Sequence, residues 1–184
     1  ISWAIGHGNK SVVTTNFRPY EVAILHAVTG MDNGIPVIWC DTGYNTPQTY
    51  KHAEELIARL GLNIKLYVPK QTSSHRDAVM GIPQIDDPLH KVFTEQVKLE
   101  PFRRAMEEHK PDVWFTNLRK GQTAHRDSLD VLSLSNDGVL KVSPFYHWSD
   151  TQLDAYLKEE GLPNEHKYFD PTKVLANREC GLHT

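Results

Sequence analysis

Short apolar runs rich in β-branched residues alternate with segments of helical periodicity along most of this chain, and this alternation limits the fold more than any other feature. The first run covers residues 11–16 and precedes a helical pattern that ends near Gly30. The second covers residues 35–40 and precedes a helical pattern that ends at Gly61. We therefore predict an α/β fold with a mostly parallel central sheet and helices on both faces.

The pattern continues beyond a long polar stretch that follows the third strand. The further elements that it predicts are strands at 63–68 and 112–117, a proline-containing helix at 97–109, an edge hairpin of strands at about 130–134 and 139–142 that turns on residues 136–138, and a last helix capped by Ser149.

Chain length, net charge and the length of the apolar runs limit the number of domains and the kinds of partner that this chain can have. The chain of 184 residues suits one domain, and we expect an α/β body at residues 1–162 with a tail at residues 163–184. The formal net charge of −3 provides no overall basic field, so we expect no nucleic-acid binding, and any phosphate site must be local. Apolar runs such as "IPVIWC" are too short to cross a bilayer, and no basic leader precedes one, so we expect a cytoplasmic protein without membrane association.

Cysteine is scarce, since only Cys40 and Cys180 are present. Two cysteines exclude a disulfide-rich framework and an iron–sulfur cluster held by four thiolates of one chain. Cys40 ends an apolar strand and is expected to be a small core residue. Neighbouring cations lower the pKa of a thiol from about 8.5 into the physiological range, and Arg178 and His183 are placed to act on Cys180 in this way. The alternative is an incidental cysteine at a chain end.

Polar segments follow three of the predicted strands. In open α/β sheets, ligands bind where the strands end at their C-terminal edge. The segments are "TTNFRPYE" after the first strand, "DTGYNT" after the second and "NLRKGQTAHR" after the fourth. Their hydroxyls, amides and cations are the groups that a phosphorylated ligand requires.

These segments, together with the end of the chain, resemble a known family, the assimilatory adenylyl-sulfate and 3′-phosphoadenylyl-sulfate reductases. That family shares its nucleotide-binding fold, described as adenine nucleotide alpha hydrolase-like or Rossmann-like, with the ATP pyrophosphatases. The resemblance extends over nearly the whole chain, and its most specific part is the terminal "RECGLH". The other matching segments are the Ser/Thr-rich loop "SVVTTNF", the Asp-Thr-Gly segment in "IPVIWCDTGYNTPQTY", the Lys-x-Glu-Pro sequence "VKLEP" and the Arg-Arg/Lys-x-Gln segment in "NLRKGQTAHR".

The resemblance implies a role for individual residues in each segment. Catalytic roles fall to Cys180, His183 and Lys98. The structural alternatives are a free-tail histidine at His183, a turn capped by Asp41, ordinary strand threonines, and solvated surface charges for the cations. Substrate-binding roles fall to Thr14, Thr15, Asn16, Phe17 and Arg18, to Asp41, Thr42 and Gly43, and to Arg119, Lys120, Gln122 and Arg126.

Three features depart from the family pattern. The family's Ser-Phe-Gly is Asn16-Phe17-Arg18 here, so a cation that can pair bidentately with a phosphate replaces a glycine. The segment between Phe169 and Arg178 is shorter than in typical members and lacks their arginines. The paired cysteines of cluster-containing members are absent near Glu95 and Gln96, so we expect no bound iron–sulfur cluster. The 10 histidines show neither an HExxH motif nor paired Cys/His spacing, so we expect no metal site.

The resemblance implies reduction of 3′-phosphoadenylyl sulfate to sulfite and adenosine 3′,5′-bisphosphate in sulfate assimilation and cysteine biosynthesis. In this chemistry the thiolate of Cys180 attacks the sulfonate sulfur and forms an S-sulfocysteine, and a thiol of thioredoxin or glutaredoxin then releases sulfite. A single catalytic thiol in the chain means that the electrons come from outside. A homodimer is compatible with the resemblance.

Other functions stay open at this point. One is a cluster-free reductase of adenylyl sulfate, the form without the 3′-phosphate. Another is a catalytically inactive nucleotide-binding relative. A third is an ATP pyrophosphatase, although the chain lacks the Ser-Gly-Gly-x-Asp-Ser loop of that group.

Overall fold

A six-stranded sheet forms the centre of the protein. The computed structural model describes residues 1–173, and residues 174–184 lie outside the described part. The strand order is β3-β2-β1-β4-β6-β5, and every neighbouring pair is parallel except the β5–β6 hairpin. The predicted α/β class, the mostly parallel sheet and the edge hairpin are confirmed. The strands are β1 (Ser11–Thr15), β2 (Val37–Cys40), β3 (Ile64–Tyr67), β4 (Val113–Phe115), β5 (Leu132–Leu134) and β6 (Leu140–Val142).

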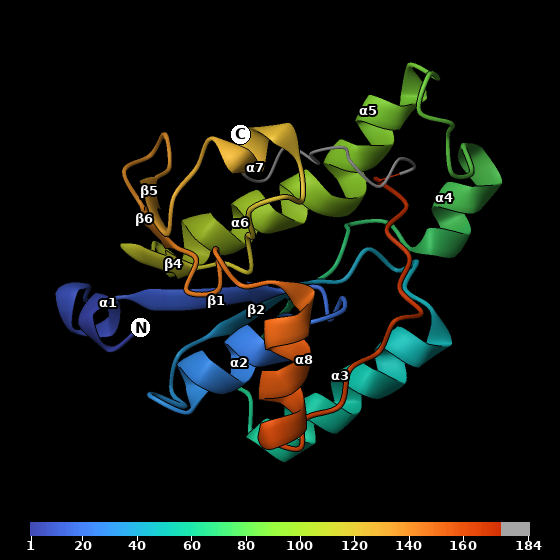
Figure 1. Ribbon diagram of the computed structural model, residues 1–184. Coiled ribbons are helices and arrows are strands. Elements are labelled where there is room, and N and C mark those ends of the chain that lie inside the picture. The colour runs from blue at the N-terminus through green and yellow to red at the C-terminus, as the bar shows by residue number, and fades with distance from the viewer. Residues whose placement is uncertain (174–184) are drawn as a thin grey trace.

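Helices cover both faces of this sheet. Figure 1 shows α2, α3 and α8 on one face and α6 on the other. The helices are α1 (Ser2–His7), α2 (Glu21–Thr29), α3 (Pro47–Leu60), α4 (Ser73–Val79), α5 (Leu89–Thr94), the π-helix η1 (Glu95–Leu99), α6 (Glu100–His109), α7 (Ala124–Asp127) and α8 (Asp150–Glu159).

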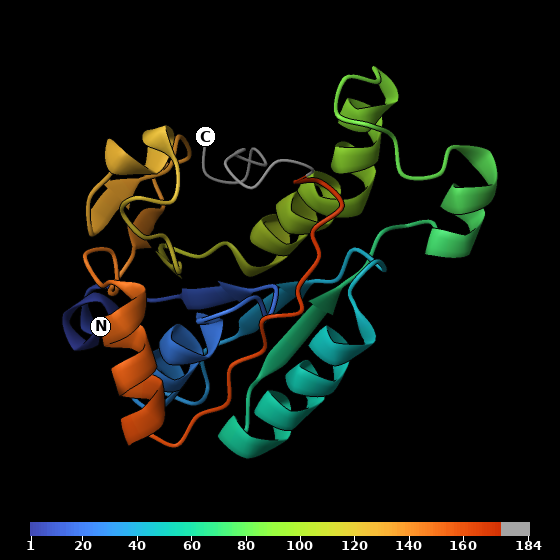
Figure 2. The ribbon, with the colours of Figure 1, turned by 45° about the vertical axis from the view of Figure 1, so that its right-hand side comes forward.

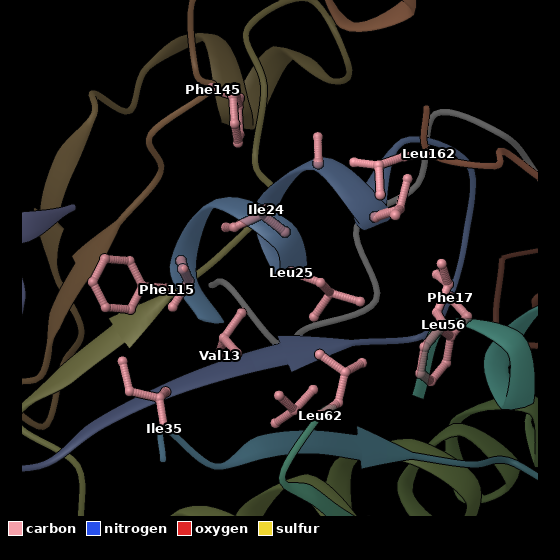
Figure 3. Packing of buried hydrophobic residues seen from close by; sticks show 14 of the residues in the cluster. Val13, Phe17, Ile24, Leu25, Ile35, Leu56, Leu62, Phe115, Phe145 and Leu162 are labelled. Carbon is pink, nitrogen blue, oxygen red and sulfur yellow. The ribbon is translucent and has the colours of Figure 1, made fainter. Parts of the chain in front are cut away.

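Successive residues of the central strands point to opposite faces and are buried on both. Val13 of β1 is fully buried in the cluster beneath α2, whereas Val12 belongs to the cluster beneath α6. Figure 3 shows Ile24 and Leu25 of α2 close to Val13. This two-sided burial explains why the central strands read as continuous apolar runs rather than as alternating patterns.

Local signals in the sequence set several of the element ends. Ser149 caps α8 through a capping box with Gln152, and Gly61 ends α3 in the left-handed conformation with φ of 61°. Both agree with the predicted positions. Helices α4 and α5 lie within the long polar stretch and were not predicted. Each buries only one or two side chains, so neither has an apolar stripe that a periodicity search detects.

The C-terminal end of α6 provides a test of backbone strain. Lys110 follows this helix with φ of 45°, a left-handed conformation that costs an L-residue about 1 kcal/mol, and its side chain is exposed. We expect Lys110→Gly to raise the free energy of unfolding by about 1 kcal/mol in urea denaturation. Lys110→Ala is the matched control, because it removes the same side chain but keeps the strained Cβ. An equal gain in both variants would contradict the strain argument.

Candidate active site

A pocket lies where β1, β2 and β4 end, at the C-terminal edge of the sheet. Parallel strands end at a common edge, so the loops that follow them are brought together there. The charged residues that line the pocket are four cations and two carboxylates, which favours an anionic ligand. These six residues are Arg18, Lys98, Arg126 and Lys173 and the carboxylates Glu21 and Asp170.

The loop after β1 is organised around one buried carboxylate. Glu21, which is only 4% exposed, accepts hydrogen bonds at Oε2 from Thr15 Oγ1 at 2.9 Å and from the Asn16 N–H at 2.7 Å. Its Oε1 accepts from Arg18 Nε at 2.7 Å. The Glu21 carboxylate therefore accepts hydrogen bonds from backbone and side-chain donors of the predicted phosphate loop, in the place of a ligand anion.

Phe17 and Arg18 complete this loop in different ways. Phe17 has φ of 53° and is 1% exposed, and its ring packs edge-on against Trp39 with centroids 4.9 Å apart. The predicted binding residue Phe17 thus belongs to the core rather than to the pocket lining. Arg18 does line the pocket, and its Nη2 donates to the Asn117 carbonyl at 3.1 Å, which links the β1 loop to the β4 loop.

Lys98 lies on the π-helix η1 and is 2% exposed. Single π-turns often occur at functional sites, and here the π-turn precedes Pro101, whose missing N–H interrupts the regular helical ladder. The Nζ atom of Lys98 lies 2.5 Å from Asp170 Oδ2 and 3.3 Å from Thr172 Oγ1. A lysine predicted from a sequence motif is thus buried in the pocket opposite a carboxylate that sequence reasoning did not single out.

The two arginines of the basic segment after β4 point to different parts of the protein. Arg126 is 2% exposed, lines the pocket and donates from Nη1 to Gln122 Oε1, so Gln122 holds the arginine rather than lining the pocket. Arg119 points to α8 instead, where it pairs with Asp150 at 2.5 Å and stacks over Tyr20 at 5.2 Å. Lys120 is exposed and is not among the pocket residues. Of the predicted cations in this loop, the structure therefore brings Arg126 into the pocket.

The Asp-Thr-Gly segment forms a turn beside the pocket rather than its wall. Asp41 Oδ1 accepts from the Gly43 N–H at 2.9 Å and from Asn45 Nδ2 at 2.8 Å, while Tyr50 donates its hydroxyl to the same carboxylate at 2.9 Å. Burial, and then the negative charge of Asp41, raise the pKa of Tyr50 to about 12, so this phenol stays protonated and keeps donating. Thr42 accepts at Oγ1 from the Tyr44 N–H at 3.2 Å. The contacts match the alternative in which Asp41 caps a turn, and helix α3 has its own cap in Thr46.

Of the two cysteines, Cys40 lies within the described residues and Cys180 does not. Cys40 is 7% exposed and belongs to the core cluster under α6, as expected. Burial raises the pKa of its thiol to about 12 despite the opposing charges of Lys98 and Arg104, so it is a poor nucleophile. Cys180 and His183, both predicted to be catalytic, lie outside the described residues.

Sequence reasoning missed several pocket residues. Glu21, Trp114, Asn117 and Asp170 all line the pocket, and none was predicted as a site residue, although Glu21 and Asn117 lie within the polar segments that follow the first and fourth strands. Trp114 donates from its indole Nε1 to Thr14 Oγ1 at 3.0 Å, which places a predicted binding threonine against an aromatic wall. Polar residues at the ends of adjacent strands were the only available signal.

Residues 1–173 contain neither a candidate metal site nor a candidate membrane span. Within that range no group of three or more His, Cys, Asp or Glu residues is arranged to hold a metal ion. In the same range no helix has both the length and the apolar character needed to cross a membrane.

Comparison with known proteins identifies relatives of this arrangement. The family model of the phosphoadenosine phosphosulfate reductase domain matches residues 10–170. The phosphoadenosine 5′-phosphosulfate reductases of Photobacterium profundum and Aliivibrio salmonicida are 35% and 36% identical to the chain over 208 aligned residues, which include 100% of this chain and 81% of each relative.

Two solved structures resemble this fold, one of them a reductase of the same family. The phosphoadenylyl-sulfate reductase of Candida auris, solved as a phosphate complex, superposes with a TM-score of 0.75 at 25% identity over 89% of this chain and 78% of its own. The FMN adenylyltransferase of Candida glabrata, solved with ATP, has a TM-score of 0.55 at 11% identity over 80% of this chain and 45% of its own, and therefore shows a shared fold alone.

The β1 loop leads to a prediction about Glu21. Both carboxylate oxygens of Glu21 accept hydrogen bonds, and replacement by glutamine keeps the shape but turns one of these acceptors into an amide NH₂ donor. We expect Glu21→Gln to lower the free energy of unfolding by about 1–3 kcal/mol in urea denaturation, because buried donors lose their acceptor. Glu159→Gln, at an exposed position near the end of α8, is the control and should change stability little. A fully stable Glu21→Gln variant would show that this carboxylate does not organise the loop.

The buried pair of Lys98 and Asp170 leads to a prediction about pH. Burial alone would raise the pKa of Asp170, but the charge and hydrogen bond of Lys98 outweigh it, so the pKa lies below the reference value of 3.8. The unfolded chain therefore takes up this proton first on acidification, and the stability from Asp170 is present above about pH 4 and lost as the pH falls through the folded pKa. We expect the free energy of unfolding to fall more steeply below about pH 4 in the wild type than in Asp170→Asn. Parallel acid limbs in the two proteins would contradict this.

Proposed function

This chain belongs to the phosphoadenosine phosphosulfate reductase family, and on that premise we propose that it reduces 3′-phosphoadenylyl sulfate to sulfite and adenosine 3′,5′-bisphosphate. Family membership makes the protein an oxidoreductase of sulfate assimilation that acts on a sulfonucleotide. The observation that carries the proposal is the position of the matched residues. The match over residues 10–170 includes the strand ends, Lys98, Arg126 and Asp170, which together line one pocket.

The pocket supplies two kinds of contact that this substrate needs. Lys98 and Arg126 are both 2% exposed, so their charges act in a partly desolvated site and favour the phosphosulfate and the charge that develops on the leaving phosphate. Phe102 and Trp114 line the same pocket with ring centroids 5.1 Å apart, and such aromatic surfaces accept a purine base. The pocket thus combines an anion site with an aromatic wall.

Cys180 is the proposed nucleophile. It lies seven residues further along the chain than the pocket residue Lys173. A fully extended chain of that length spans about 25 Å, which is enough for a thiol to return to the pocket. Its thiolate forms an S–S bond with the sulfonate sulfur while the S–O bond to the phosphate breaks, and the nucleotide leaves with that electron pair. Cys40 does not serve this role, because its thiol is buried with a raised pKa.

An external dithiol completes the cycle. One thiolate of thioredoxin or glutaredoxin attacks the Sγ atom of sulfonated Cys180 and displaces sulfite, which carries away the electron pair of the S–S bond. The partner's second thiol then reduces the mixed disulfide and regenerates the Cys180 thiolate. Two electrons pass from the partner to the sulfur, and the partner ends as a disulfide.

The β1 loop argues against the ATP pyrophosphatase alternative. A pyrophosphate bound by such a loop needs backbone N–H donors. Here the Asn16 N–H donates to Glu21 at 2.7 Å, and a second oxygen of the same carboxylate pairs with Arg18. Pyrophosphate would have to displace a buried, negatively charged side chain from this position.

Sulfite release tests the proposed function. With reduced thioredoxin, we expect sulfite from 3′-phosphoadenylyl sulfate at a higher kcat/KM than from adenylyl sulfate, and a loss of at least about a thousandfold in Cys180→Ser, because the nucleophile is removed. Without reductant, intact mass should show one added SO₃ group on the wild type and on Cys40→Ala, but none on Cys180→Ser.

The possible results separate the alternatives. Sulfite from neither nucleotide, with nucleotide binding retained, would favour the inactive relative. A preference for adenylyl sulfate would favour the cluster-free adenylyl-sulfate reductase.

A further inference from the structure

The last described part of the chain forms part of the pocket lining through Tyr168, Asp170 and Lys173. We call residues 162–173 the strap. Figure 2 shows it leaving α8, passing α3 and ending near α6. No helix or strand forms within the strap, so its path depends on contacts with the rest of the protein.

Two of these contacts join neutral groups. Asn164 Oδ1 accepts from the Tyr20 N–H at 2.9 Å at the start of α2. The Lys167 carbonyl accepts from Thr46 Oγ1 at 2.7 Å at the start of α3. Neither contact involves a residue that lines the pocket, so an anionic ligand leaves both in place.

Another contact of the strap is ionic and lies inside the pocket. Asp170 Oδ2 is 2.5 Å from Lys98 Nζ, and the side chains are 7% and 3% exposed, respectively. Asp170 Oδ1 accepts from the Thr172 N–H at 3.0 Å and from the Thr172 hydroxyl at 2.6 Å. The Asp170 carboxylate therefore joins the pocket lysine to the end of the strap, and Lys98 Nζ also lies 3.3 Å from Thr172 Oγ1.

An anionic ligand and Asp170 compete for the same cation. Both lie in one pocket, and like charges within a few ångströms repel strongly when they are shielded from water. A ligand anion on Lys98 also replaces the charge that Asp170 supplies, so the lysine keeps a counter-ion when the carboxylate leaves. The exchange is thus balanced for Lys98 and loosens only the part of the strap beyond the neutral contact at Lys167, where the burial of Pro171 and Thr172 continues to contribute to its anchoring.

We propose that Asp170 is an exchangeable counter-ion of Lys98, which the anionic group of the bound nucleotide displaces, so that nucleotide binding loosens residues 170–173. This inference rests on the proposed function for the identity of the nucleotide. Asp170 acts as a positioning residue: it occupies Lys98 until the anion of the substrate takes its place. The coupling makes the loosening of residues 170–173 depend on a ligand with an anion at this point.

The exchange predicts that removing the Asp170 carboxylate raises the affinity for a nucleotide, and this can be measured. Calorimetric titration with adenosine 3′,5′-bisphosphate should show Asp170→Asn binding about tenfold more tightly than the wild type, because the competing carboxylate is gone. Adenosine, which has no anion, should show no such gain. Asp137→Asn, which removes an exposed carboxylate in the β5–β6 turn, is the matched control and should bind like the wild type.

Weaker or equal binding by Asp170→Asn would overturn the proposal, since a residue that merely orients Lys98 or supports the fold would weaken binding when removed. Failure of the wild type to bind either sulfonucleotide or the bisphosphate would instead overturn the proposed function, and the exchange with it. Normal sulfite release together with unchanged affinity in Asp170→Asn would overturn the exchange alone.

Hydrogen exchange of the wild type provides a second measurement that needs no variant. The Thr172 N–H donates to the Asp170 carboxylate two residues earlier in the strap, so displacement of Asp170 from Lys98 brings this local hydrogen bond out of the pocket and into contact with water. Saturating adenosine 3′,5′-bisphosphate should speed exchange in a peptide that covers residues 170–173 by about tenfold, and should leave a peptide around Asn164 unchanged. Slower or unaltered exchange at residues 170–173 would contradict the proposed loosening.

Discussion

Burial of the central strand β1 on both of its faces sets the geometry on which the rest of the structure depends. Val12 and Val13 are both at most 2% exposed and point to opposite helical layers. Parallel partners on both sides, with Val13 in register with Val37 and Phe115, oblige β1, β2 and β4 to end at one edge. The polar loops that follow must therefore meet there, and they form the pocket.

Several charges of the pocket have counter-groups within the same chain. Arg18 pairs with Glu21, Lys98 with Asp170, and Arg126 bonds to Gln122. Buried charges require such partners, because removal from water is costly unless a counter-ion or hydrogen bond compensates. The partners differ in how they are held. Glu21 belongs to helix α2, whereas Asp170 lies on a strap without secondary structure, which is why the proposed exchange involves Asp170.

Strong periodic patterns made most elements predictable. The runs at residues 11–16 and 35–40 became β1 and β2 to within two residues at either end, because strands buried on both faces need continuous apolar sequence. Helices α4 and α5 escaped prediction because they bury few side chains. The basic loop shows a different limit: Arg119 and Arg126 look equivalent in the sequence, yet one pairs with α8 and the other enters the pocket.

The α/β class, the order of the elements and the caps at Ser149 and Gly61 could be read from the sequence, because they depend on neighbours along the chain through periodicity, capping and local propensity. The family resemblance and the motif that contains Lys98 rest on matching sequence segments. The position of Glu21 in the β1 loop and that of Asp170 opposite Lys98, 72 residues away in sequence, became visible only in three dimensions. The choice of a counter-ion depends on which charges are withdrawn from water at the same point in space, and no local pattern in the sequence records that.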